Sequence, residues 1–161
     1  MRRLLLVVGL VSVACSRTTP IPAPAGPQRF GVAAFGDVDP LDHLATLRNA
    51  GCDYVEPALS RLAALPPAGR AAVHERLIRS GLGVEAMNWF LPAELKVTGP
   101  DVDAVATTRY LHDALPLAAS FGAKVVVFGS PASRSFPTGF PRPRAERQLV
   151  LFLQACDDVI C

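Results

Sequence analysis

The chain has 161 residues, of which 50% are hydrophobic and 19% are charged, with 15 prolines and 12 glycines. This composition excludes a disordered chain, and no apolar run reaches the roughly 18 residues of a membrane-spanning helix. Sixteen basic and fourteen acidic side chains leave a formal charge of +2. Because no basic stripe with interleaved aromatic residues is visible, we predict no nucleic-acid partner.

The N-terminal segment has the composition of an export signal. Two arginines near the start precede the apolar stretch Leu4 to Val13, which is followed by Ala14 and Cys15. A cysteine at this place resembles the processing site of bacterial lipoproteins, in which the cysteine is acylated and becomes the new N-terminus. We therefore predict a signal peptide over residues 1–14, lipidation of Cys15, and an exported protein that is lipid-anchored to the bacterial cell envelope. Ordinary secretion, a misassigned start and an uncleaved anchor are the alternatives.

Residues 15–28 are predicted to form a proline-rich tether. The stretch from Ser16 to Gln28 contains four prolines and no periodic apolar pattern, which is typical of a chain that stays extended. A single folded domain is therefore expected over residues 29–161.

From Arg29 onward, strand-like and helix-like segments alternate. Short apolar runs predict four strands, at Phe30–Phe35, Asp53–Ala58, Val84–Leu91 and Lys124–Phe128. Apolar residues at helical spacing predict a helix after each strand, and these helices are expected to start near Asp39, Pro66, Asp101 and Arg144. Pro116 lies inside the third helix and is expected to kink it or to mark its last turn. A long loop, Gly129–Pro143, is expected before the last helix.

Four successive strand-helix units without a hairpin signal require right-handed crossovers and an all-parallel sheet. The run Lys124–Phe128 has the β-branched composition of a parallel strand covered on both faces. The candidate folds are a doubly wound sheet and part of a (β/α)8 barrel. A doubly wound nucleotide-binding sheet would need a glycine-rich turn after its first strand, and Phe35 to Val38 do not provide one.

Three strings of residues carry a resemblance to a known family. They are GCDYVEP at 51–57, EAMNWFLPAELKVTGP at 85–100 and FGAKVVVFGSPASRSFPTGF at 121–140. In this order and at this spacing they resemble the sugar phosphate isomerase and epimerase family, the xylose isomerase-like barrels, over essentially the whole folded part. The resemblance implies an α/β fold made of parallel (β/α) units of a TIM barrel, about four of eight, which is the N-terminal half barrel.

The same resemblance implies which parts of a full barrel this chain does not contain. In the family, acidic and histidine side chains at the ends of the fifth to eighth strands hold a divalent metal, and two of the acids shuttle the proton during epimerisation. We therefore assign no catalytic residue and no metal ligand to this chain, and expect the divalent metal only in a full-length member. The histidines His43, His74 and His112 fall on predicted helices, and no CxxC pair occurs.

Barrel geometry places the expected site at the carboxyl ends of the strands. The predicted substrate-binding residues are Glu56, Asn88, Phe90, Ser130 and Arg134. Glu56 and Asn88 suit sugar hydroxyls, whereas Arg134 suits a phosphate or carboxylate and matches an arginine that the family often shows after its GS turn. The alternatives are local ion pairs and loop hydrogen bonds. Because Trp89 and Phe90 alternate along a strand, only one can face the mouth and stack on a sugar, and the predicted site takes Phe90.

Three functions remain open, so whether the chain is an enzyme stays undecided. The first is half of a metal-dependent isomerase or epimerase for a sugar or sugar phosphate, truncated before the metal site and inactive alone. The second is a non-catalytic carbohydrate- or partner-binding lipoprotein, and the third is an incomplete gene product. Four parallel strands leave two unpaired edges. We therefore expect a second half-barrel chain or a second copy as partner, besides the membrane reached through the lipid anchor.

Overall fold

The computed structural model of the chain describes residues 5–7 and 28–160. The predicted lipidation site at Cys15 and the predicted tether up to residue 27 lie outside the described residues. Within the described part, no helix is long and apolar enough to cross a membrane.

All strand pairs of the described residues are parallel, as the sequence predicts. One sheet has the order β2-β3-β4 and the other has the order β1-β6-β5. The strands are β1 (Leu5–Val7), β2 (Gly31–Ala33), β3 (Tyr54–Glu56), β4 (Gly83–Val84), β5 (Ala86–Met87) and β6 (Val125–Val127). The registers place Val32 beside Val55 and Met87 beside Val126.

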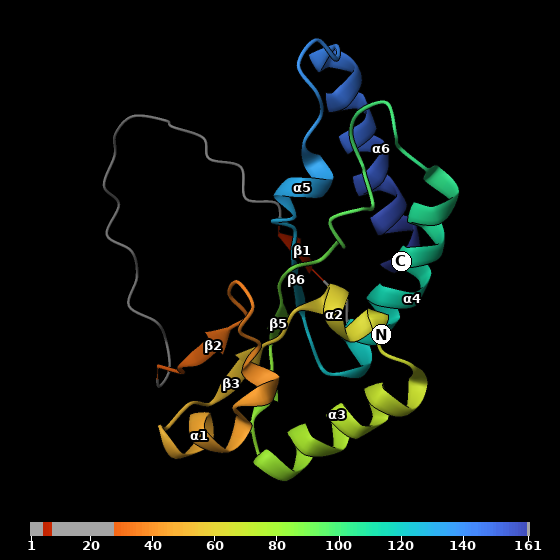
Figure 1. The fold of residues 1–161 in the computed structure, drawn as a ribbon. Coiled ribbons are helices and arrows are strands. Elements are labelled where there is room, and N and C mark those ends of the chain that lie inside the picture. Colours follow the sequence, from red (N-terminus) through yellow and green to blue (C-terminus); the bar gives the residue numbers. More distant parts are fainter. Residues whose placement is uncertain (1–4, 8–27, 161) are drawn as a thin grey trace.

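The predicted strand Val84–Leu91 is interrupted, and this corrects the sequence prediction. β4 pairs with β3, whereas β5 pairs with β6, and Glu85 lies between them. The strand breaks where it changes its partner, and the backbone amide of Lys124 donates a 2.9 Å hydrogen bond to the carbonyl oxygen of Glu85 at this point. The two short sheets are therefore joined through Glu85 into one wall of strands, and Figure 1 shows β2, β3, β5 and β6 following one another in this order.

Helical segments follow each of the strands β2, β3, β5 and β6, which confirms the predicted alternation. The segments are η1 (Pro40–Asp42), α1 (Leu44–Asn49), α2 (Leu59–Ala64), α3 (Pro67–Ser80), α4 (Ala104–Ser120), α5 (Pro131–Arg134) and α6 (Arg142–Ile160). Helices α1, α3, α4 and α6 lie in an arc around one side of the strands (Figure 1). α2 and α5 were not predicted, and α5 falls inside the stretch expected to be a long loop.

The helix starts follow local capping chemistry. Asp39 caps the first helical segment as predicted, and its side chain accepts hydrogen bonds from the backbone amides of Leu41 (3.1 Å) and Ala58 (3.3 Å). The predicted cap of α4 at Asp101 is wrong. Asp103 is the cap, because its carboxylate lies 2.9 Å from the amide of Ala106. α4 continues past Pro116 to Ser120, so Pro116 lies inside the helix near its last turn, as predicted.

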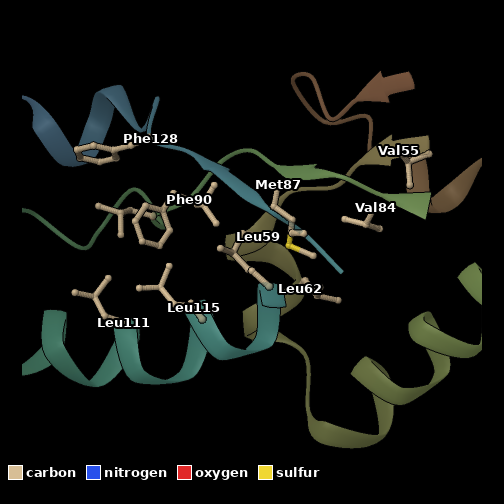
Figure 2. Close-up of a cluster of buried hydrophobic side chains, with 14 of the residues drawn as sticks. Val55, Leu59, Leu62, Val84, Met87, Phe90, Leu111, Leu115 and Phe128 are labelled. Carbon is tan, nitrogen blue, oxygen red and sulfur yellow. The ribbon is translucent and has the colours of Figure 1, made fainter. Parts of the chain in front are cut away.

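The core lies between the strands and the helices. Figure 2 shows apolar side chains from the strands meeting leucines of α2 and α4. The fully buried members of this cluster include Val55, Leu59, Met87, Phe90, Leu111 and Val126. An aromatic group extends the cluster toward α6, because the ring of Phe90 lies 6.1 Å from that of Phe128 and 6.0 Å from that of Phe152. This packing fixes the positions at which the strands end.

A candidate binding cavity at the carboxyl ends of the strands

A cavity of about 590 Å³ opens at the carboxyl ends of the parallel strands. Its walls come from residues that follow β2, β3, β5 and β6, and because parallel strands end at one edge, these residues meet although they are far apart in sequence. The lining residues used below are Phe35, Arg61, Asn88, Trp89 and Ser130. The location is the one that barrel geometry predicts for a binding site.

Asn88 brings an unused hydrogen-bond acceptor to this cavity. Its Nδ2 donates a 2.9 Å hydrogen bond to the carbonyl oxygen of Ala34, which fixes the orientation of the amide. Its Oδ1 is buried and has no hydrogen-bond partner among the described residues. A buried acceptor without a partner destabilises the fold by about 1–3 kcal/mol. A hydroxyl that donates to this oxygen would remove that penalty.

Trp89 presents its ring at the cavity from an unusual backbone conformation. Its φ is +46°, which side chains other than glycine rarely adopt. The residue is 44% exposed although it is a large apolar one. The guanidinium of Arg61 lies 5.3 Å from the centre of the indole ring and also donates a hydrogen bond to the carbonyl oxygen of Gly36. The guanidinium of Arg61 thus contacts the ring of Trp89, and the ring stays partly exposed to solvent.

The backbone around Trp89 is tied to three other elements. The amide of Ser60 in α2 donates to the carbonyl of Trp89 at 3.0 Å, and the hydroxyl of Tyr110 in α4 donates to the carbonyl of Phe90 at 2.5 Å. The amide of Leu91 donates to Oγ of Ser130 at 3.0 Å. These bonds hold the segment in its strained conformation.

Two of the five predicted site residues line the cavity. Asn88 and Ser130 do, and Ser130 is 8% exposed with a φ of +28°. Glu56 is half-buried at the end of β3, where its carbonyl accepts a 2.9 Å bond from the amide of Ala34, and it does not line the cavity. Arg134 does not line it either. Its guanidinium lies 5.4 Å from the ring centre of Phe128, and its Nε is buried without a hydrogen-bond partner among the described residues.

The placement of Phe90 at the mouth is wrong, because Phe90 is fully buried in the core. Trp89 takes the place at the cavity that the sequence analysis gave to Phe90. Arg61 was missed, because α2 was not predicted. The cation paired with an aromatic residue is visible only once α2 and the end of β5 are next to each other.

Clear electrostatic shifts occur on the helical layer and in the core. Arg70 in α3 and Asp113 in α4 form two 2.7 Å hydrogen bonds, and these hold the pKa of the Asp113 carboxyl below its usual range and raise that of Arg70. Burial raises the pKa of the Tyr110 hydroxyl. Burial also raises the pKa of the Cys156 thiol to about 12. Tyr110 therefore stays protonated as a hydrogen-bond donor.

The described residues do not fit the divalent metal that the family resemblance implies for a full-length barrel. Across residues 5–7 and 28–160, no three histidine, cysteine, aspartate or glutamate side chains gather where they could hold a metal ion. The cavity is lined by apolar, amide, hydroxyl and guanidinium groups instead. This donor set suits a polyhydroxylated organic ligand.

Comparisons with known proteins support the fold. No family model matches the sequence, and no curated protein matches it. Among solved structures, a D-psicose 3-epimerase determined in the presence of D-fructose matches with a TM-score of 0.56 at 12% identity, over 82% of this chain and 50% of that protein. The 3-keto-D-glucoside 4-epimerase from E. coli matches with a TM-score of 0.55 at 14% identity, over 80% of this chain and 50% of that protein.

These similarities confirm the predicted architecture. The chain has a parallel α/β fold like that of the two matched epimerase structures and spans about half the length of each. At 12% and 14% identity, the comparison establishes the fold, and activity is a separate question.

Proposed function

We propose that the chain binds a sugar or sugar derivative in the cavity at the carboxyl ends of its strands, as the substrate-binding half of an isomerase or epimerase barrel. The observation that carries the proposal is that one cavity holds both the exposed, strained Trp89 and the Oδ1 of Asn88, which has no hydrogen-bond partner within residues 5–7 and 28–160. Two solved structures with this fold are named as sugar epimerases, which supports the same ligand class.

The chemistry of the cavity suits a sugar ring. The flat indole of Trp89 offers a stacking surface for the apolar C–H face of a pyranose or furanose. The Oδ1 of Asn88 accepts a hydrogen bond from a hydroxyl group of the sugar, which satisfies a buried atom that has no partner in the described part of the chain. A volume of about 590 Å³ lies within the range of small-molecule sites, roughly 300–1,000 Å³. The guanidinium of Arg61 lies 5.3 Å from the centre of the Trp89 ring and suits an anionic sugar derivative.

The proposal separates binding from catalysis. Isomerisation or epimerisation needs a group that takes a proton and a group that returns it, and no such pair is assigned to the described residues. The chain is therefore proposed to be inactive alone and to need a second half-barrel chain or a second copy. A non-catalytic carbohydrate-binding lipoprotein would use the same cavity without that partner.

We also propose that the protein acts outside the cytoplasm. The support is the order of two arginines, an apolar stretch, Ala14 and Cys15 at the N-terminus. Cleavage after Ala14 and acylation of Cys15 would leave the folded domain tethered to the membrane. The intact mass of the protein purified from bacterial membranes tests this, because acylated Cys15 as first residue gives a defined mass and an unmodified N-terminus contradicts it.

The experiment that tests sugar binding compares Trp89→Ala with Phe30→Ala by calorimetric titration with D-fructose. Phe30 is 64% exposed and does not line the cavity, so it controls for the loss of an exposed aromatic ring. We expect Trp89→Ala to weaken binding about tenfold, which corresponds to about 1.4 kcal/mol. Phe30→Ala should bind as the original protein does.

Two results would contradict the proposal. The first is equal D-fructose affinity in the Trp89→Ala and Phe30→Ala variants, which would show that the Trp89 ring in the cavity does not contribute to D-fructose binding. The second is the appearance of an isomeric sugar in NMR spectra after incubation with the chain alone, which would show that this half carries the catalytic groups itself.

A further inference from the structure

The edge of β6 that faces away from β5 is occupied by a strand from the N-terminal segment. β1 pairs with β6 in parallel, with Leu5 beside Val125, Leu6 beside Val126 and Val7 beside Val127. On its other side β6 pairs with β5. β6 is thus an inner strand of its sheet because β1 is present.

Backbone alternation shows which groups of β6 face β1. The amide of Lys124 donates to the carbonyl of Glu85 on the β5 side, so the amides of Lys124 and Val126 face β5. The backbone groups of Val125 and Val127 consequently face β1. In a complete (β/α)8 barrel, this position beside the fourth strand belongs to the next parallel strand. β1 therefore has the place and the direction of a barrel strand.

The opposite edge of the wall, at β2, carries no strand among the described residues. All three residues of β2 are exposed, and Phe30 next to it is 64% exposed. The amide of Ala34 donates to the carbonyl of Glu56 in β3, so by alternation the amide of Ala33 points to the free edge. Unpaired edges of this kind readily pair with another chain.

We infer that β1 is a removable edge strand, and that its removal lets the β2 edge of a second copy pair with β6. Two copies would then form two identical β2–β6 contacts related by a twofold axis, and these contacts close one parallel eight-stranded barrel. The predicted cleavage before Cys15 removes Leu5–Val7, so assembly follows export.

We favour β2 of a second copy as the strand that replaces β1, because β2 has the same length and can pair with the edge of β6 in the same direction as β1. β1 demonstrates that β6 accepts a short parallel strand, and β2 is short, parallel and open at the required side. The described strands correspond to half of each matched structure, and β2 and β6 are the two edges that this half leaves for pairing. The inference rests on backbone pairing and not on the proposed sugar chemistry, so either can fail without the other.

The test uses the full 161-residue chain and measures its mass in solution by light scattering after size exclusion. Leu6→Pro at the centre of β1 removes a backbone amide and should disrupt the strand. Val11→Pro, in the same apolar stretch of the sequence, is the matched control. We expect the original chain and Val11→Pro to be monomers and Leu6→Pro to have twice the monomer mass.

A second variant identifies the partner edge. Ala33→Pro removes the amide that faces the free edge of β2 and leaves the bond from Ala34 to Glu56 in place. The double variant Leu6→Pro with Ala33→Pro should return to the monomer mass. The inference is overturned if Leu6→Pro stays monomeric, if it forms species larger than a dimer, if the double variant remains dimeric, or if the original chain is already a dimer.

Discussion

The ring of Phe90 is central to the folded molecule although its neighbour Trp89 is exposed. Phe90 has no exposed surface, and its ring lies within 6.3 Å of the rings of Tyr110, Phe128 and Phe152, measured between centroids. Such a ring contributes both apolar burial and close packing, and the surrounding side chains cannot fill its volume when it is removed.

Phe90→Ala should lower the free energy of unfolding by about 3–5 kcal/mol, the range for large core rings. Urea unfolding followed by circular dichroism measures this. The control is Phe35→Ala, because Phe35 is 85% exposed and its loss should change stability by no more than about 0.5 kcal/mol. Equal losses in the two variants would mean that Phe90 is not a core residue.

For single residues, the sequence indicates which segments lie at the cavity better than it indicates which side chains of those segments point into it. Asn88 and Ser130, both predicted as site residues, line the cavity, because Asn88 follows β5 directly and Ser130 lies shortly after the end of β6. The choice between Trp89 and Phe90 fails because β5 ends at Met87, and Trp89 then adopts a positive φ. Strand alternation therefore no longer determines which ring faces the cavity.

Individual elements are predictable where they are long or strongly apolar. α3, α4 and α6 span 14, 17 and 19 residues and carry a clear helical period. α2 and α5, with six and four residues, are too short to show one. The break at Glu85 depends on strand partners that are remote in sequence, so local pattern alone does not predict it.

The start of α4 provides a test of capping at the element scale. Asp103→Ala removes the carboxylate that accepts from the amide of Ala106 and should lower the free energy of unfolding by about 1 kcal/mol. Asp101→Ala, at the cap that the sequence suggested, should change it by less than about 0.5 kcal/mol. Urea titrations of both variants decide which aspartate caps the helix, and the opposite order of effects would contradict the structure.

For the whole molecule, the order of strands and helices follows from the sequence, but the place of β1 does not. An apolar segment near the N-terminus is compatible with export as well as with a strand, and only the open edge of β6 selects the pairing that the structure shows. Long-range pairing of this kind depends on the finished sheet, so no local pattern encodes it.

Stability of the whole molecule should depend on pH through the pair that joins α3 and α4. The lowered pKa of Asp113 means that its carboxylate stabilises the fold above the unfolded pKa of about 3.9, and this contribution is lost as the pH falls through the lower folded value. Asp113→Asn should cost no more than about 1 kcal/mol at pH 7, because half of the Asp113 side chain is exposed.

Urea unfolding of both proteins at several pH values checks this sign. The difference between them should shrink as the pH is lowered below about 3.9. Glu146→Gln is the matched control, since Glu146 pairs with Arg142 on a more exposed helix face and should have a smaller effect at pH 7. A difference that grows toward acid pH would contradict the assignment.

The hydrogen bonds around residues 88–91 have a consequence for how this fold can diversify. The carbonyls of Asn88, Trp89 and Phe90 each accept from a different residue, and none of these bonds uses the indole side chain. The ring at the cavity can therefore be exchanged by mutation while the path of the chain is preserved. A single substitution at position 89 could therefore change which ligand the cavity binds while the fold stays the same.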